Sequence, residues 1–319
     1  MSTLPAPIVA ARNLRVDLDG RVLCEQLTLE ADADRSVLVG TGASAIARAV
    51  TLRGQISQGT LRVAGYDVGA EQHLGKIGLA PLDPPLPPRM TVRELLAISF
   101  RAAGCSGRRS RDLAAVALQE AGLPSLATRH TESLALPERR AVAIAQALLP
   151  DASCVFLESP LDGLEGRAAD YVLQILGHVS DKRRVVATAT RLDARSSQRD
   201  LLMGAQHIVI ADSNHVVWSG KPEGLVGAAH LVAVTLAGDT TRFIERLLAH
   251  GFNVQGAPPH IAIMAPAAPF PDLVHLAAES GAIILEMDPW VPSLQAQDAG
   301  TGSAATPGPL QPLSGAQVP

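Results

Sequence analysis

Short apolar runs alternate with amphipathic stretches over residues 8–228, and this alternation constrains the fold more than any other feature of the chain. The apolar runs suit strands that are buried on both faces of a sheet. They are Ser36–Val39, Lys76–Ala80, Cys154–Leu157, Arg184–Ala187 and His207–Ala211. The helix-like stretches between them include Val92–Ala103, Arg111–Ala121, Glu138–Leu149 and Gly166–His178. Strands that alternate with helices predict an α/β domain with a largely parallel sheet.

A second pattern begins near His230 and predicts a smaller α+β domain over residues 229–294. Its expected order is strand, helix, strand, strand, helix, strand, which is typical of a ferredoxin-like βαββαβ arrangement. The segments are Leu231–Leu236, Thr240–His250, Phe252–Gln255, His260–Met264, Asp272–Ser280 and Ala282–Met287. Residues 295–319 are rich in Ala, Gly, Pro, Gln, Ser and Thr, so we expect a disordered tail. Residues 1–228 form the predicted first domain, with a helical subdomain at about residues 90–150.

Composition argues against several classes of function. The net charge of −4 and the scattered basic residues give no stripe for nucleic acid. The three cysteines, Cys24, Cys105 and Cys154, lack the spacing of a metal site and are expected to be free thiols in a reducing compartment. We find neither a signal peptide nor an apolar run of about 18 residues, which predicts a cytoplasmic protein. Any association with a membrane would then depend on a partner.

The most specific motif lies in Leu134–Glu165, which reads LALPERRAVAIAQALLPDASCVFLESPLDGLE. A helix that follows Pro137 leads through a Pro-Asp turn into a strand, and the strand ends in Glu-Ser-Pro. This stretch resembles the ATP-binding subunits of ABC transporters, in which a signature loop and helix lead into the Walker B strand and the D-loop. The resemblance implies a P-loop-type α/β domain with a helical subdomain, and a membrane permease as partner.

Further family landmarks follow in the expected order, so the resemblance covers residues 8–228. Ile8–Gly20 resembles the first strand and the adenine-binding loop, and Arg35–Gly40 resembles the strand that enters the Walker A loop. Ile77–Glu94 resembles the Q-loop region of the family, and Val185–Asp193 resembles its H-loop strand. Val216–Leu225 resembles the hairpin that closes the domain. The small domain that follows also resembles the C-terminal extension of exporter-type members.

The phosphate-binding loop departs from the family pattern. Such a loop turns Gly-rich backbone N–H groups toward phosphates, and it supplies a Lys and a Ser or Thr for Mg²⁺. The corresponding segment, Gly40-Thr41-Gly42-Ala-Ser44 through Arg48, contains no Lys. The helix expected near Arg48 arrives about three residues early compared with the family, which predicts a shortened loop. Ser44 is interpreted as an ordinary helix N-cap.

The other positions at which the family contacts nucleotide also differ. No aromatic residue lies near Leu18 to stack on adenine, and Leu82 at the Q-loop position cannot bind a metal. The remaining replacements are Ala135 and Glu138 in the signature, Glu158 and Ser159 after the Walker B strand, and Thr190 in the H-loop. Glu158 is interpreted as a capping or salt-bridging residue. These replacements predict no catalytic residue, no metal site and no bound cofactor.

The favoured hypothesis from sequence is therefore a pseudo-ATPase that is not an enzyme. It would be a structural or regulatory subunit of a membrane transport or export complex, peripheral on the inner face of the cytoplasmic membrane. Its partner would be a permease, another ABC ATPase-like subunit, or both. Two alternatives stay open: an active ABC ATPase with atypical motifs, which would bind ATP and Mg²⁺, and a soluble interaction or sensor protein. The basic cluster Gly107–Arg111 is interpreted as a solvated first turn of a helix, with a partner or lipid headgroup contact as the alternative.

Overall fold

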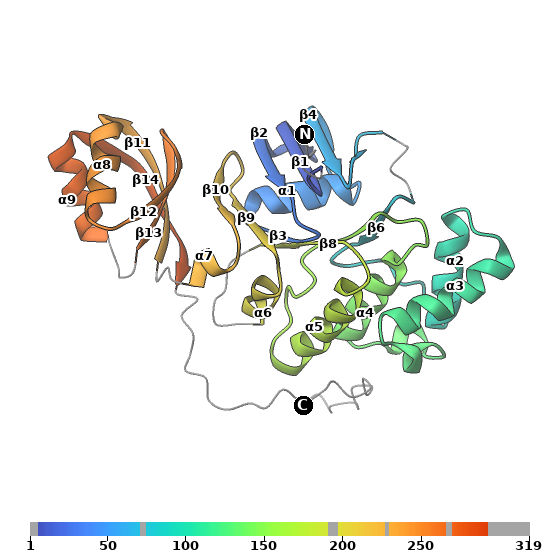
Figure 1. Ribbon diagram of the computed structural model, residues 1–319. Helices are drawn as coiled ribbons and strands as arrows, with labels where there is room; N and C mark the ends of the chain where they lie inside the picture. Colours follow the sequence, from blue (N-terminus) through green and yellow to red (C-terminus); the bar gives the residue numbers. More distant parts are fainter. Residues whose placement is uncertain (1–5, 71–74, 191–196, 227–229, 266–269, 293–319) are drawn as a thin grey trace, which may run out of the picture. The chain divides into compact units, whose positions relative to one another are not determined.

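The computed structural model describes residues 6–70, 75–190, 197–226, 230–265 and 270–292 (Figure 1). The chain divides into two compact units. The first unit contains Met1–Gly69 and Thr188–Asp298, and the second contains Ala70–Ala187. The domain boundary expected after residue 228 and the tail expected over 295–319 lie outside the described residues. Within the described residues, no helix is both long and apolar enough to cross a membrane.

An antiparallel sheet with the strand order β2-β1-β4-β5 opens the first unit. Asp19 and Gly20 both have positive φ values, 50° and 76°, and connect β1 to β2 in a tight hairpin, as Asp-Gly sequences commonly do. The strands are β1 (Val9–Leu18), β2 (Arg21–Ala31), β4 (Gln55–Val63) and β5 (Tyr66–Asp67). β1 pairs with both β2 and β4, and it buries Val9, Leu14 and Val16 completely.

Three further strands of the first unit follow the order β10-β9-β3. β3 (Arg35–Val39) pairs in parallel with β9 (His207–Ala211), and β10 (Val216–Gly220) returns antiparallel beside β9. The helices of this part are α1 (Thr41–Val50), α6 (Gln198–Met203) and α7 (Glu223–Val226). Four of the five residues in β3 and in β9 are buried, which explains why both strands read as continuous apolar runs.

The second unit contributes parallel strands in the order β8-β7-β6. These are β6 (Ile77–Ala80), β7 (Cys154–Leu157) and β8 (Val185–Ala189), the last of which runs across the boundary between the units. The α-helices are α2 (Val92–Ala102), α3 (Gly107–Glu120), α4 (Leu136–Ala147) and α5 (Gly166–Ser180), and two short 3₁₀ turns are Pro124–Leu126 and Thr131–Ser133. The predicted α/β class with parallel strands is confirmed.

The last six elements of the first unit follow the order strand, helix, strand, strand, helix, strand. They are β11 (His230–Gly238), α8 (Thr240–Ala249), β12 (Asn253–Ala257), β13 (His260–Ala265), α9 (Phe270–Ser280) and β14 (Ala282–Pro292). Their antiparallel sheet has the order β12-β13-β11-β14. The ferredoxin-like classification of this region stays a proposal.

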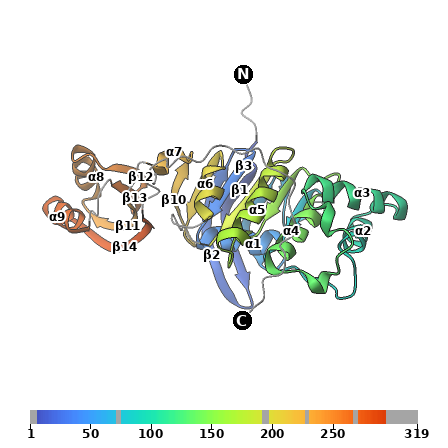
Figure 2. The ribbon, with the colours of Figure 1, turned by 90° about the horizontal axis from the view of Figure 1, so that it is seen from below.

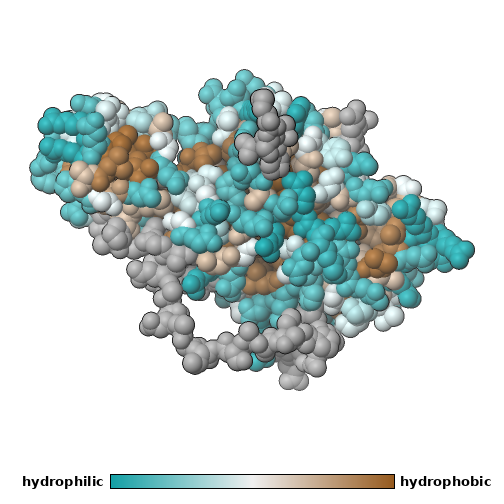
Figure 3. Space-filling model, viewed as in Figure 1, coloured by the Kyte–Doolittle hydropathy of each residue, from teal (hydrophilic) through white to brown (hydrophobic). Residues whose placement is uncertain are grey.

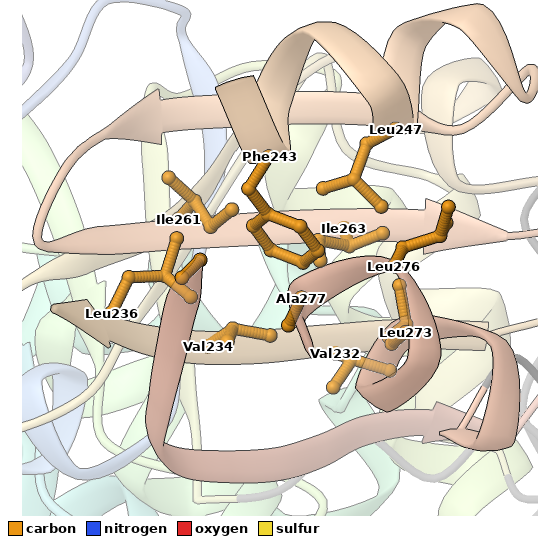
Figure 4. Packing of buried hydrophobic residues seen from close by; sticks show 11 residues of the cluster. Val232, Val234, Leu236, Phe243, Leu247, Ile261, Ile263, Leu273, Leu276 and Ala277 are labelled. Atoms are coloured by element: carbon orange, nitrogen blue, oxygen red, sulfur yellow. The ribbon is translucent and has the colours of Figure 1, made fainter. Parts of the chain in front are cut away.

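One face of this C-terminal sheet is covered by α8 and α9, as Figure 4 shows. Phe243 and Leu247 of α8 and Leu273 of α9 are fully buried against Val232 and Ile263 of the sheet. The opposite face is partly open: Ile283 and Leu285 of β14 are 58% and 64% exposed. Figure 3 shows an apolar patch over this part of the sheet. The two helices α8 and α9 therefore cover one face of this sheet, and apolar side chains on the other face stay exposed.

Candidate functional site

A single residue, Gly40, connects β3 to α1 at the position of the Walker A loop. Gly40 has a φ of 104°, a conformation that favours glycine, and its N–H donates to the carbonyl oxygen of Ala189 at 2.9 Å. The helix begins at Thr41, seven residues before the start predicted near Arg48. Ser44 is not the N-cap that the sequence suggested, because Gly40 occupies that place and the Ser44 hydroxyl donates to the Gly40 carbonyl at 3.2 Å.

The first turn of α1 is closely packed against the end of β9. A Cβ atom added at Gly42 would lie 2.2 Å from the carbonyl oxygen of Asp212 and 3.1 Å from the side chain of Ala211. A phosphate cradle needs several residues of Gly-rich loop whose N–H groups converge on the ligand. A one-residue link followed by a packed helical turn without a Lys does not fit that description. We therefore assign no nucleotide contact to this turn.

In the second unit, the Walker B and Q-loop positions contact each other through a backbone group. Glu158 is 4% exposed, and its Oε2 accepts a hydrogen bond from the N–H of Leu82 at 3.0 Å. The Glu158 N–H donates in turn to the carbonyl of Ala80 at 2.9 Å. Ser159, which follows, has a φ of 43° and is 6% exposed. The interaction at position 82 comes from the main chain, so the residue type alone could not predict it.

Arg140 is a residue of this region whose position the sequence did not predict. It lies in α4, is 8% exposed, and its Nε has no hydrogen-bond partner among the described residues. Burial lowers the pKa of the Arg140 guanidinium, and the nearby carboxylates of Asp83, Asp162 and Glu158 oppose that shift. A buried cation near three carboxylates offsets part of their mutual repulsion. The sequence showed Arg140 only as part of a Glu-Arg-Arg helix start.

Glu138, at the signature position, is buried at the start of α4. The Oε1 of Glu138 accepts from the Nη1 of Arg129 at 2.7 Å, and its Oε2 accepts from the N–H of Ala135 at 2.9 Å. Arg129 also donates to the carbonyl of Ser133 at 2.6 Å, so it connects the preceding turn to the helix. A carboxylate in the first helical turn is favoured by the free N–H groups there. Burial raises the pKa of the adjacent Tyr171 to about 12, and Glu138 adds to that rise.

The remaining predicted position, Thr190, is exposed and directly follows β8 in the first unit. Its neighbour Ala189 accepts the hydrogen bond from Gly40, so the Walker A and H-loop positions are brought together there. The positions Leu82, Ala135, Glu138, Glu158 and Ser159 belong to the second unit. No group of three or more metal-ligating side chains occurs among the described residues.

Comparison with known proteins identifies the class to which this architecture belongs. Residues 38–162 match the ABC transporter family model. The cbiO1 protein from Clostridium perfringens, described as part of the ABC transporter complex cbiONQ, superposes with a TM-score of 0.57. That match covers 69% of this chain and 90% of cbiO1 at 16% identity, so it shows a shared fold. The resemblance of the chain to ATP-binding subunits of ABC transporters is thereby confirmed.

Three curated relatives extend this comparison. The zinc import ATP-binding protein ZnuC of Ruegeria pomeroyi is 27% identical, covering 76% of this chain and 89% of ZnuC. The Nod factor export ATP-binding protein I of Rhizobium sp. (strain N33) is 26% identical, covering 63% and 72%. The Fe(3+) ions import ATP-binding protein FbpC of Streptomyces coelicolor is 25% identical, covering 69% of this chain and 63% of FbpC. The relatives include both import and export proteins.

The comparisons correct one prediction. The expectation that the chain is not an enzyme is wrong by this comparison, because these relatives are ATP-binding subunits of a family of ATPases. Replacement of individual motif residues therefore does not by itself predict the absence of enzyme activity.

Proposed function

We propose that the chain is the ATP-binding-type subunit of a membrane transport complex, held at the inner face of the membrane by a permease subunit. The observation that carries this proposal is the match of residues 38–162 to the ABC transporter domain. The shared fold with cbiO1, which is part of a transporter complex, supports it. A second ATPase-like subunit is the other expected partner. The names of the relatives favour neither import nor export.

The polar residues at the motif positions have a structural role in this proposal. Glu138 closes the start of α4 through Arg129 and Ala135, and Glu158 holds the segment after β6 through the N–H of Leu82. Both carboxylates are buried and hydrogen-bonded, which is what a buried charge requires for stability. No reaction step is assigned to ATP at the Gly40 turn.

Co-purification from membranes tests the proposal. An affinity-tagged full-length chain is expressed in its native cells, the membranes are solubilised in a mild detergent, and bound proteins are identified and quantified. We expect a protein with several membrane-spanning segments in fixed ratio to the tagged chain, and none from cells with an untagged chain. Recovery of the chain without any membrane protein would overturn the proposal and favour the soluble interaction or sensor protein.

A further inference from the structure

Two histidine rings stack where the β9–β10 hairpin meets the C-terminal sheet of the first unit. His215 lies in the turn of the hairpin and His260 begins β13, and their ring centroids are 3.4 Å apart. β10 is an edge strand of its own sheet, as Figures 1 and 2 show, and it contacts β12 and β13. The N–H of Ser219 in β10 donates to the Oε1 of Gln255 in β12 at 3.4 Å. The rings therefore belong to a polar contact between two sheets.

The groups that face the two rings come from several elements. Asp212, in the hairpin, lies 3.7 Å from the Nδ1 of His215 and accepts the N–H of that residue at 2.6 Å. Glu286 of β14 lines the same small cavity as the rings. β11 contributes a neutral group, the hydroxyl of Thr235, which lies 3.3 Å from the Nδ1 of His260. Among the described residues that line this cavity, the two histidines are the only basic ones.

The cavity beside the rings is too small for an organic ligand. Its volume is about 30 Å³, which is room for a water molecule. Val217 of β10 and Ile261 of β13 line it as well, and they are 6% and 3% exposed. The apolar part of the contact is therefore closed around the stacked rings, and the arrangement suits a contact that opens and closes better than a binding pocket.

We propose that the stacked pair His215–His260, which we call the histidine latch, holds the β9–β10 hairpin against the C-terminal sheet at neutral pH and releases it in acid. Neutral aromatic rings attract each other when they stack, whereas two protonated rings at this distance repel. Histidine is the side chain whose charge ordinarily changes between pH 5 and 8. The proposal concerns a contact within one chain, so it does not depend on a permease.

The electrostatics of His260 agree with this direction. Burial and the neighbouring His215 lower the pKa of His260 more than Asp212 and Glu286 raise it. The closed latch therefore binds fewer protons at His260 than the released one, and its stability is lost as the pH falls below the ordinary histidine pKa. Protonation of paired histidines is an established way to bias a two-state contact.

Thiol labelling on β10 measures release of the latch. Val217→Cys places a thiol beside the stacked rings, and Cys105→Ser removes the natural cysteine that is not buried. The full-length chain is labelled with dithiodipyridine at pH 7.5 and at pH 5.5. Each rate is divided by the rate of the same variant unfolded in urea at the same pH, which corrects for ionisation of the thiol. We expect the normalised rate to rise about fivefold at the lower pH.

Matched histidine variants show whether the latch causes this rise. His215→Gln combined with His260→Gln removes both titrating rings, and we expect its normalised rates at the two pH values to agree within about twofold. His250→Gln combined with His275→Gln replaces two exposed histidines of the same region and should keep the full rise. Cys24 is 1% exposed in the same unit and should stay unlabelled throughout, which separates release of the latch from unfolding.

Hydrogen exchange of the chain without any substitution gives an independent measurement. The N–H of Ser219 donates across the contact, so exchange in residues 212–220, corrected for the intrinsic rate, should be faster at pH 5.5, and exchange in β1 should not. Unchanged exchange in residues 212–220 would overturn the inference, as would equal normalised labelling at both pH values. A rise in labelling that persists without the two histidines, or that is accompanied by labelling of Cys24, would also overturn it.

Discussion

Two turns at the ends of buried strands, one in each unit, are fixed by different kinds of interaction. After β3, the backbone fixes the turn: Gly40 donates to Ala189, and Gly42 leaves no room beside the Asp212 carbonyl. After β7, a buried carboxylate fixes the turn, because Glu158 accepts from the N–H of Leu82. The first turn is therefore sensitive to added volume, and the second to the loss of charge or of a hydrogen bond.

The largest effect is expected from Glu138→Ala, which removes a second buried carboxylate of the second unit. Its loss leaves Arg129 without its ion pair and the N–H of Ala135 without an acceptor. Breaking a buried ion pair costs about 3–5 kcal/mol. Because the Arg129 side chain is 32% exposed, we expect the free energy of unfolding to fall by about 2–3 kcal/mol. Urea denaturation of the variant and of wild type measures this fall.

Glu94→Ala is the matched control for this variant. Glu94 makes the same backward hydrogen bond at the start of α2 but is exposed to solvent, so we expect a smaller loss of stability. Equal losses for the two variants would show that burial of Glu138 contributes nothing.

Gly42→Ala tests the close packing of the turn after β3. The added methyl group would meet the Asp212 carbonyl at 2.2 Å, so either the helix or the β9 end must shift. Overpacking of this kind costs about 1–3 kcal/mol. Gly177→Ala, in α5, is the control because nothing lies within 4 Å of its added Cβ, and we expect it to stabilise the protein by about 0.5–1 kcal/mol. A neutral Gly42→Ala would contradict the packing account.

Glu158→Gln tests the polar turn after β7. The amide keeps the shape of the side chain but loses the charge that strengthens its hydrogen bond to the Leu82 N–H and that faces Arg140. We expect a loss of about 1–2 kcal/mol in urea denaturation. Leu82→Ala keeps the N–H donor and should cost less. A larger loss from Leu82→Ala would show that the leucine side chain, and not its N–H, matters at this position.

The smallest effect is expected from a change of pH, which acts on a pair of histidines in the first unit. The rings of His215 and His260 stack with their centroids 3.4 Å apart. The hydroxyl oxygen of Thr235 lies 3.3 Å from the Nδ1 of His260. Burial lowers the pKa of His260, the neighbouring His215 lowers it further, and Asp212 and Glu286 oppose the shift.

The sign of the pH effect follows from this lowered pKa. The folded protein binds fewer protons at His260 than the unfolded chain does. The contribution of His260 to the free energy of unfolding is therefore complete above the ordinary histidine pKa near 6.5, and it is lost as the pH falls below that value. Wild type should therefore lose more stability between pH 7.5 and pH 5.5 than His260→Gln does. Identical pH profiles would show that His260 makes no such contribution.

The elements that could be predicted from sequence are those fixed by local pattern. The observed bounds of β7 and β9 are the predicted ones, because both strands are apolar runs bordered by polar residues. The start of α1 could not be predicted from family spacing, because an Ala-rich segment extends the helix back to Thr41. The partner of Glu138 was also out of reach, since Arg129 approaches it through a turn nine residues earlier in the chain.

Native mass spectrometry of the detergent-solubilised complex tests the proposal that this chain is a subunit of an ABC transport complex. The full-length chain is purified from native membranes without crosslinking, and the masses of the intact assembly and its subunits are measured. We expect an assembly that contains this chain and a multi-spanning permease in a fixed ratio. An assembly that contains only copies of this chain, or the chain alone, would contradict it.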